Sequence, residues 1–177
     1  MIALFLKGGV LMWPILLCSV VALAIALSKT LQYRAVLSSL CRAPAALLDE
    51  QPPMLAALLD GIARGLDDRE LSLIGTRHIR ELEKGLGVLS LISVITPLLG
   101  LTGTVTGMIR AFQIIAGAGS QVNPGLLAGG IWEALLTTAA GLFVAIPVHI
   151  AHHFLEERLD EIALSLQETA VALAEGR

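Results

Sequence analysis

From residue 85 to residue 109 the chain carries no charged side chain, and Lys84 and Arg110 bound this run. A run of this length can cross the ~30 Å hydrocarbon core of a bilayer as a helix that rises ~1.5 Å per residue. Two further runs meet the same length criterion, residues 9–28 and residues 126–153. The three runs predict an all-α membrane protein with three transmembrane helices.

The composition agrees with this class and excludes others. Hydrophobic residues make up 55% of the chain and charged residues 15%, with a mean hydropathy of +0.79, whereas a soluble domain has roughly 25% charged residues. Cys18 and Cys41 are too few and too differently placed for a disulfide framework or a zinc site. The sequence has no basic stripe with interleaved aromatics, no nucleophile–base pattern and no phosphate loop. We therefore expect no nucleic-acid partner, no metal, no cofactor and no enzymatic activity.

Charge asymmetry predicts the orientation of the helices. Most of the 12 Lys and Arg residues lie in residues 29–84, and the loop at 111–125 has none. By the positive-inside rule, residues 29–84 and the C-terminus are cytoplasmic, and the N-terminus and the short loop lie on the other side. The first apolar run lacks a small-residue cleavage site and is followed by Lys29 and Arg34, which predicts a retained anchor.

The expected organisation follows from these boundaries. It comprises residues 1–29 as the N-terminus and first transmembrane helix, 30–84 as a cytoplasmic helical segment, 85–110 as the second transmembrane helix, 111–125 as an external loop, 126–153 as the third transmembrane helix, and 154–177 as a cytoplasmic C-terminal helix.

Two cytoplasmic stretches are amphipathic. Residues 54–82 have apolar positions at helical spacing with mixed charges opposite. After the third run, apolar residues recur at steps of four and three and form a heptad-like seam: Leu155, Leu159, Ile162 and Leu166. Such a seam requires helical neighbours, which could come from the same chain or from other subunits.

Glu133 is the only Asp, Glu, Lys or Arg between Arg110 and Glu156, and it lies within the third apolar run. A carboxylate in hydrocarbon costs roughly 2.5–3.5 kcal/mol on insertion scales. On a helical wheel, Glu133 lies on a different face from Thr138. This position favours a role at a subunit boundary or a pore entrance, with a purely structural carboxylate as the alternative.

Hydroxyl side chains form stripes on the second and third predicted helices. Thr104 shares a sector with Ser90, Ser93 and Pro97 on the second helix. On the third helix, the sector of Thr138 contains Ala145, His149 and His152. These stripes could line a polar path or an interface, or each hydroxyl could donate to a carbonyl of its own helix.

Small residues and prolines mark packing positions. Gly100, Gly103 and Gly107 form overlapping small-residue steps that permit close helix approach. Pro97 and Pro147 lie inside the predicted membrane helices, where proline commonly produces a kink.

Two long stretches resemble signatures of the MotA/TolQ/ExbB proton-channel family. Residues 96–112, TPLLGLTGTVTGMIRAF, resemble the second-helix signature, and residues 130–147, GIWEALLTTAAGLFVAIP, resemble the third-helix signature. The opening at residues 5–17, FLKGGVLMWPILL, is similar to the start of short ExbB-like members. The resemblance covers essentially the whole chain.

The resemblance implies a subunit of a bacterial inner-membrane ring, expected to be a pentamer, with its N-terminus and residues 111–125 in the periplasm. The ring would enclose an ExbD/TolR-like single-span partner, and a TonB-like protein is a further candidate partner. Proton flow through the assembly would drive TonB-dependent transport or a related envelope process. Thr104, Thr138 and Glu133 match the family positions on the ion path, and the family's proton-carrying Asp belongs to the partner.

Two features depart from the family pattern. Many ExbB-like members carry Trp at the position of Thr106, and His149, His152 and His153 are particular to this chain. Because imidazole titrates near neutral pH, we hypothesise that His149 passes protons to the cytoplasm. A structural scaffold that conducts no ion, or a sodium-driven homologue, stays open as an alternative, as does the choice between the TonB and Tol–Pal systems.

Overall fold

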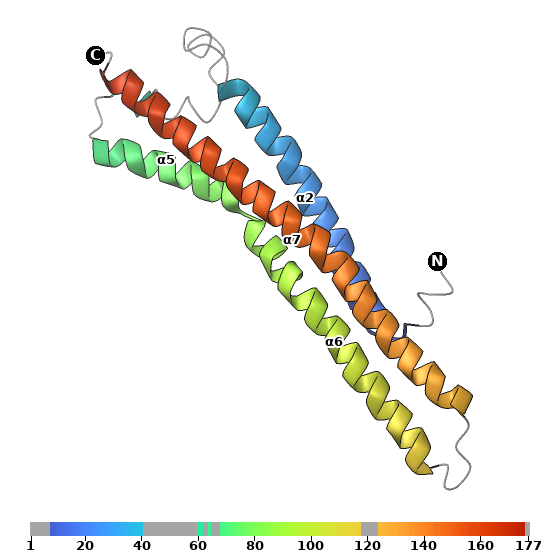
Figure 1. Cartoon of the computed structure of the whole chain (residues 1–177). Helices are drawn as coiled ribbons and strands as arrows, with labels where there is room; N and C mark the ends of the chain where they lie inside the picture. The colour runs from blue at the N-terminus through green and yellow to red at the C-terminus, as the bar shows by residue number, and fades with distance from the viewer. Residues whose placement is uncertain (1–7, 41–59, 62–63, 65–67, 118–123, 176–177) are drawn as a thin grey trace. The chain divides into compact units, whose positions relative to one another are not determined.

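The computed structural model describes residues 8–40, 60–61, 64, 68–117 and 124–175, and all regular structure in these residues is helical. The main helices are α2 (Met12–Leu40), α5 (Asp68–Glu83), α6 (Leu86–Gly117) and α7 (Pro124–Glu175) (Figure 1). Among them, three are long and apolar enough to cross a membrane, with apolar stretches in Met12–Leu37, Leu73–Gly117 and Ala128–Glu168. The all-α class with three spanning helices is thus confirmed.

Two helices continue past the expected boundaries. α2 runs through residue 29 to Leu40, and α7 runs through residue 153 to Glu175. No Gly or Pro occurs in residues 29–40 or 153–175, so neither segment contains a strong helix breaker. α6 also extends beyond Arg110 to Gly117, which makes the first part of the expected loop at 111–125 helical.

A turn separates α5 from α6 at Lys84 and Gly85. Gly85 has a φ of 98°, a conformation that side-chain-bearing residues rarely adopt. The amphipathic stretch expected at residues 54–82 therefore ends close to this turn, and α5 accounts for its second part. Its beginning at residues 54–59 lies outside the described residues.

The chain divides into two compact units. The first unit contains Met1–Ala26 and Val88–His152, and the second contains Leu27–Gly87 and His153–Arg177. Each of α2 and α7 contributes one part to each unit.

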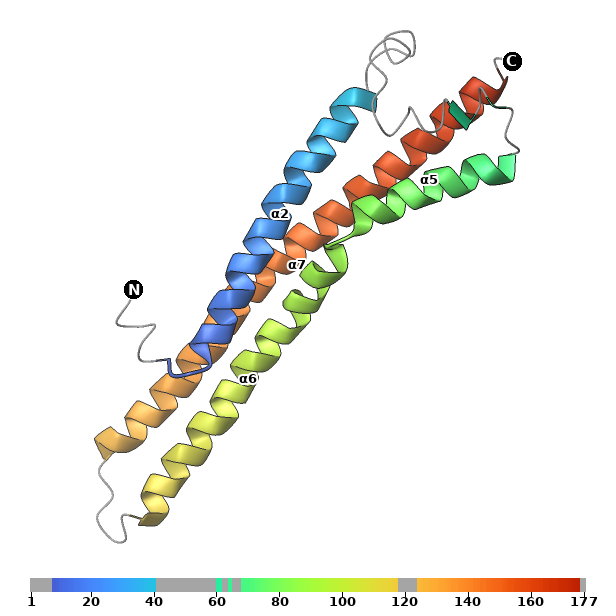
Figure 2. The same ribbon diagram turned by 180° about the vertical axis from the view of Figure 1, so that it is seen from behind.

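In the first unit, α6 and α7 pack antiparallel, side by side in the front and back views (Figures 1 and 2). Gly100 faces the backbone of Thr138, and Gly107 faces Ala134. At Gly141, a Cβ atom would lie 2.8 Å from the Thr96 carbonyl oxygen. These approaches leave no room for side chains, so the two helices meet backbone to backbone.

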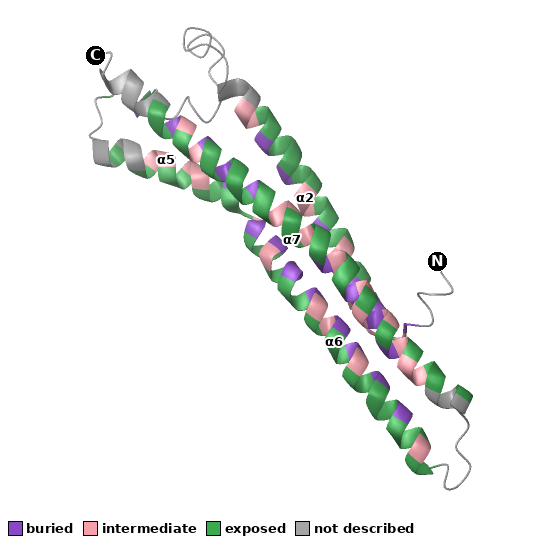
Figure 3. Cartoon of the chain, viewed as in Figure 1, coloured by how far each residue is buried: buried purple, intermediate pink, exposed green. Residues whose placement is uncertain are grey.

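The outer surface of the first unit is apolar. Figure 3 shows exposed residues along α2, α6 and α7. Large apolar side chains are prominent among them, including Leu17, Leu23, Leu101, Val105 and Phe143, the last with 79% of its surface exposed. Because contiguous apolar surface of this extent is unfavourable in water, lipid or other protein chains must cover it.

In the second unit, the seam of α7 is buried within the chain. Leu155, Leu159, Ile162 and Leu166 are all almost inaccessible to solvent, and Ile162 is completely so. The helical neighbours that the sequence left unassigned are therefore supplied by the same chain.

A pair of side chains on α2 caps α5 in the second unit. Lys29 Nζ and Tyr33 Oη each donate to the carbonyl oxygen of Leu82 at 2.9 Å, and both side chains are buried. The last carbonyls of a helix have no partner within it, and a cation is favourable at this end of the helix dipole. Lys29 and Tyr33 thus satisfy an otherwise unpaired carbonyl at the end of α5.

Candidate functional site

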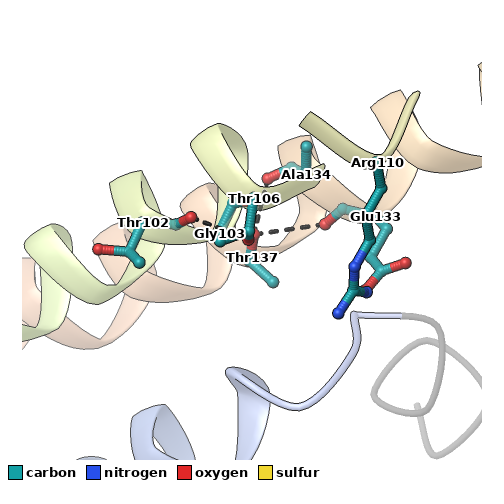
Figure 4. Close-up of polar contacts among 7 residues, drawn as sticks. All are labelled: Thr102, Gly103, Thr106, Arg110, Glu133, Ala134 and Thr137. Atoms are coloured by element: carbon teal, nitrogen blue, oxygen red, sulfur yellow. Dashed lines mark hydrogen bonds and ion pairs between the residues drawn. The ribbon is translucent and has the colours of Figure 1, made fainter. Parts of the chain in front are cut away.

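Glu133 forms an ion pair across the first unit. Arg110 Nη1 on α6 lies 3.3 Å from Glu133 Oε1 on α7 (Figure 4). The Glu133 side chain is 32% exposed and the Arg110 side chain 62%. The carboxylate therefore has a counter-charge from its own chain, which lowers the cost of placing it in an apolar helix.

Sequence reasoning missed Arg110 as this partner. It treated Arg110 as the charge that ends the second transmembrane helix, but α6 continues to Gly117. Residues 110 and 133 lie at similar distances in sequence from the connection between α6 and α7, so an antiparallel hairpin brings them to one level. Their opposite charges and this symmetric spacing were the available signal.

Gly9 lies against the Glu133 carboxylate. A Cβ atom built on Gly9 would overlap Oε1 of Glu133, and Gly9 has a φ of 72°. Its carbonyl accepts a 3.3 Å hydrogen bond from the backbone N–H of Met12, at the start of α2. The turn that precedes α2 therefore lies directly against the carboxylate.

Thr138 and Thr104 make different hydrogen bonds. Thr138 Oγ1 donates across the hairpin to the Gly100 carbonyl at 2.8 Å. Thr104 Oγ1 donates to the Leu101 carbonyl of its own helix at 2.7 Å. Both residues are partly exposed. The two acceptor carbonyls belong to consecutive residues of α6, Gly100 and Leu101.

Two further threonines are buried in the hairpin. Thr137 donates to the Ala134 carbonyl at 2.7 Å, and its side chain packs against Gly103 (Figure 4). Thr96 is fully buried and donates to the Ile92 carbonyl at 2.6 Å. Both hydroxyls are satisfied by their own helices, which fits a packing role.

The hydroxyl group of Thr106 is paired within α6. Its hydroxyl lies within hydrogen-bond distance of the Thr102 carbonyl at 2.9 Å and of the Gly103 carbonyl at 3.1 Å (Figure 4). Thr106 is exposed, so this turn of α6 presents a small side chain on the outer face of the helix.

The histidines lie in different surroundings. His149 is exposed, whereas Ala145, one turn earlier on α7, is buried. His149 follows Thr138 by eleven residues, a rise of about 16 Å at ~1.5 Å per residue. In the second unit, His153 Nε2 lies 3.5 Å from Glu157 Oε1 on the next turn. His149 and Thr138 are thus not in contact.

The remaining predicted residues are placed as follows. Pro97 is partly exposed and Pro147 exposed, and α6 and α7 continue through them without interruption. Within the described part of the chain, no group of three or more His, Cys, Asp or Glu side chains could hold a metal ion.

The chain belongs to the MotA/TolQ/ExbB proton channel family, whose model matches residues 46–168. It is 30% identical over 185 residues to the biopolymer transport protein exbB1 of Vibrio cholerae serotype O1, covering 91% of this chain and 81% of that protein. It is 44% identical over 99 residues to the biopolymer transport protein ExbB of Neisseria gonorrhoeae, with 53% and 44% covered. Identity to the Tol–Pal system protein TolQ of Haemophilus influenzae is 39% over 94 residues, with 53% and 41% covered.

These matches define the class of the protein. It is a multi-pass membrane protein of a channel family, related to ExbB and TolQ, and it is not an enzyme. The chain spans less than half the length of the TolQ and Neisseria ExbB relatives, and four-fifths of exbB1.

Proposed function

We propose that the chain is the ring-forming subunit of a proton-driven motor in a bacterial inner membrane. The observation that carries this proposal is the family match over residues 46–168, which includes most of the α6–α7 hairpin with Thr104, Thr138 and Glu133. The motor couples the proton motive force to TonB-dependent transport or a related envelope process. Each proton that crosses a membrane potential of 100 mV releases roughly 2.3 kcal/mol.

Assembly into a homo-oligomer, proposed as a pentamer, is supported by the apolar surface. Only 11% of the most apolar window in Met12–Leu37 is buried within the chain, against 33% in Leu73–Gly117 and 28% in Ala128–Glu168. Copies of the chain would cover part of this surface, and lipid the remainder. The N-terminus would be periplasmic and the C-terminus cytoplasmic, as the distribution of Lys and Arg predicts.

The ion path would use the hydroxyl oxygens of Thr104 and Thr138. Both hydroxyl protons are engaged with carbonyls, but a hydroxyl oxygen retains lone pairs that accept hydrogen bonds. Such acceptors suit water or a protonated carboxyl group. Glu133 would mark the periplasmic entrance, and His149 would pass protons to the cytoplasm.

The proton-carrying carboxylate would come from an ExbD/TolR-like single-span protein inside the ring. The three apolar runs of this chain contain no Asp, so force production would require the second protein. A TonB-like protein is the proposed further partner on the TonB branch, and a Tol–Pal system is the alternative branch.

A scaffold that conducts no ion is the second candidate. Two observations favour it: the donors of Thr104 and Thr138 are used inside the chain, and Glu133 is paired with Arg110. In that case these polar groups only stabilise the hairpin.

Substitution in the assembled complex separates the two candidates. Co-expression with an ExbD/TolR-like protein from the same genome, followed by affinity purification, measures assembly, and dye-reported proton uptake into proteoliposomes measures transport. The motor predicts that Thr138→Val and Glu133→Ala each abolish uptake while the complex still co-purifies. Absence of uptake by a parent complex that co-purifies with its partner would contradict the motor and support the scaffold. Full uptake by both variants would contradict the assignment of Thr138 and Glu133 to the ion path.

A further inference from the structure

We propose that Arg110 and Gly9 are positioning residues for Glu133. Arg110 supplies the counter-charge from α6, and Gly9 supplies the space that the carboxylate occupies in front of α2. This inference rests on the proposed function only for its transport readout, because the placement itself can be measured on the protein without its partners.

The role of Arg110 follows from charge and geometry. Glu133 and Arg110 are separated by 23 positions in sequence, yet Nη1 and Oε1 are 3.3 Å apart. Two opposite charges brought together in an apolar helix pair cost less than the same two charges left unpaired. Without Arg110, the carboxylate would lack this partner and would be expected to turn toward another polar group or toward water.

The role of Gly9 follows from two independent requirements at one position. Its φ of 72° favours glycine, and its Cβ position is occupied by Oε1 of Glu133. A methyl group at residue 9 would therefore push the carboxylate away. Because Oε1 is also the atom that meets Arg110, displacing it weakens the ion pair.

The groups around Glu133 come from α6, from α7 and from the turn before α2. Arg110 approaches from α6 and Gly9 from the turn before α2, while Thr137 lies one turn further along α7. Figure 4 shows the guanidinium group of Arg110 directed at the carboxylate. The carboxylate is thus the point at which the turn before α2 meets the α6–α7 hairpin.

Double-mutant cycles on thermal unfolding of the detergent-solubilised protein test the placement. Arg110→Gln should lower Tm in the parent chain and lower it by less than half as much in a Glu133→Gln background. Gly9→Ala should also lower Tm, and by less than half as much in a Glu133→Ala background. There the clash between the new Cβ and the carboxylate is absent, and only the cost of the positive φ remains. Coupling of this kind is the signature of direct contact.

Other glycines provide matched controls. Gly85→Ala introduces comparable backbone strain, at a φ of 98°, in the second unit, so its effect should add to that of Glu133→Ala. Gly129→Ala meets nothing within 4 Å of its Cβ and should not lower Tm, because alanine is favoured over glycine inside a helix. If the Gly9→Ala variant does not accumulate in the parent chain, its accumulation in the Glu133→Ala background is the result that shows coupling. If Gly9→Ala prevents accumulation in both backgrounds, the role of Gly9 is contradicted.

Proton uptake by the complex distinguishes positioning from simple stabilisation. Arg110→Lys should retain most uptake because it preserves the charge, whereas Arg110→Gln and Glu133→Gln should each lower the rate of uptake at least tenfold. Coupling in Tm with unchanged uptake would support the placement but overturn the proposed role of Glu133 in transport. Additive Tm effects in both cycles would overturn the inference, whatever the uptake.

Discussion

The two units of the chain are each stabilised internally by a different kind of packing. In the first unit, Gly100, Gly107 and Gly141 let two helices approach backbone to backbone. In the second unit, the large side chains of Leu159 and Ile162 fill the interior. Lipid tails are as apolar as leucine, so helices in a membrane gain from close contact and little from burying apolar surface. A seam among charged residues gains mainly from that burial.

This contrast makes opposite changes harmful. Adding atoms should damage the first unit, and removing atoms should damage the second.

The largest effect is expected from removing atoms at Ile162. Its side chain is fully buried, and Ile→Ala substitutions in a core typically cost about 2–5 kcal/mol. We expect Ile162→Ala to lower the Tm of the solubilised protein strongly. Leu164→Ala, two positions away and 59% exposed, is the control and should change Tm little. Equal effects at both positions would mean that the seam is not the core of the second unit.

Adding one methyl group at Gly141 comes next. The new Cβ would lie 2.8 Å from the Thr96 carbonyl oxygen and 3.3 Å from Gly100 Cα. Overpacking of this kind costs about 1–3 kcal/mol. Gly141→Ala should therefore lower Tm, whereas Gly117→Ala, which meets nothing within 4 Å, should not. A tolerated Gly141→Ala would show that α6 and α7 can separate without loss.

A smaller effect is expected at the cap of α5. Tyr33→Phe removes one of the two hydrogen bonds to the Leu82 carbonyl, and a hydrogen bond contributes about 0.5–1.5 kcal/mol net. Hydrogen–deuterium exchange should accelerate at the end of α5, and further in Tyr33→Phe combined with Lys29→Met. Gln32→Ala removes only the 3.1 Å contact to Lys29 and serves as the control. Unchanged exchange in the double variant would rule out a role for the cap.

The smallest structural effect is expected at His149, which is exposed. His149→Ala should leave Tm unchanged, and the relay hypothesis predicts an altered pH dependence of proton uptake between about pH 6 and pH 8. His153→Ala is the comparison on the same helix. The same uptake profile for His149→Ala and the parent complex would remove His149 from the proton path.

Much of the fold could be predicted from local sequence pattern. The charge-free run at residues 85–109 is enough to require a membrane helix, and the family signatures place Thr104 and Thr138 on two such helices. The spacing of apolar residues from Leu155 to Leu166 predicted the seam, but it did not predict which helices pack against it. A period reports which face of a helix is apolar, but it does not report what covers that face.

The contacts of Glu133 could not be predicted in the same way. Its pairing with Arg110 depends on the register between α6 and α7, and its contact with Gly9 depends on the path of the chain before α2. Neither is encoded in the spacing along one helix. The same holds for Thr138, whose bond to the Gly100 carbonyl joins two helices, whereas the bond of Thr104 within α6 follows from local geometry.

We propose that this chain, with an ExbD/TolR-like partner, conducts protons along its Thr-lined hairpin. The most direct test is proton uptake into proteoliposomes that contain the purified complex, driven by a potassium-diffusion potential in sodium-free buffer. We expect uptake that requires both proteins and is lost in Thr138→Val. Absence of uptake in the complete complex, or uptake that appears only with a sodium gradient, would contradict it.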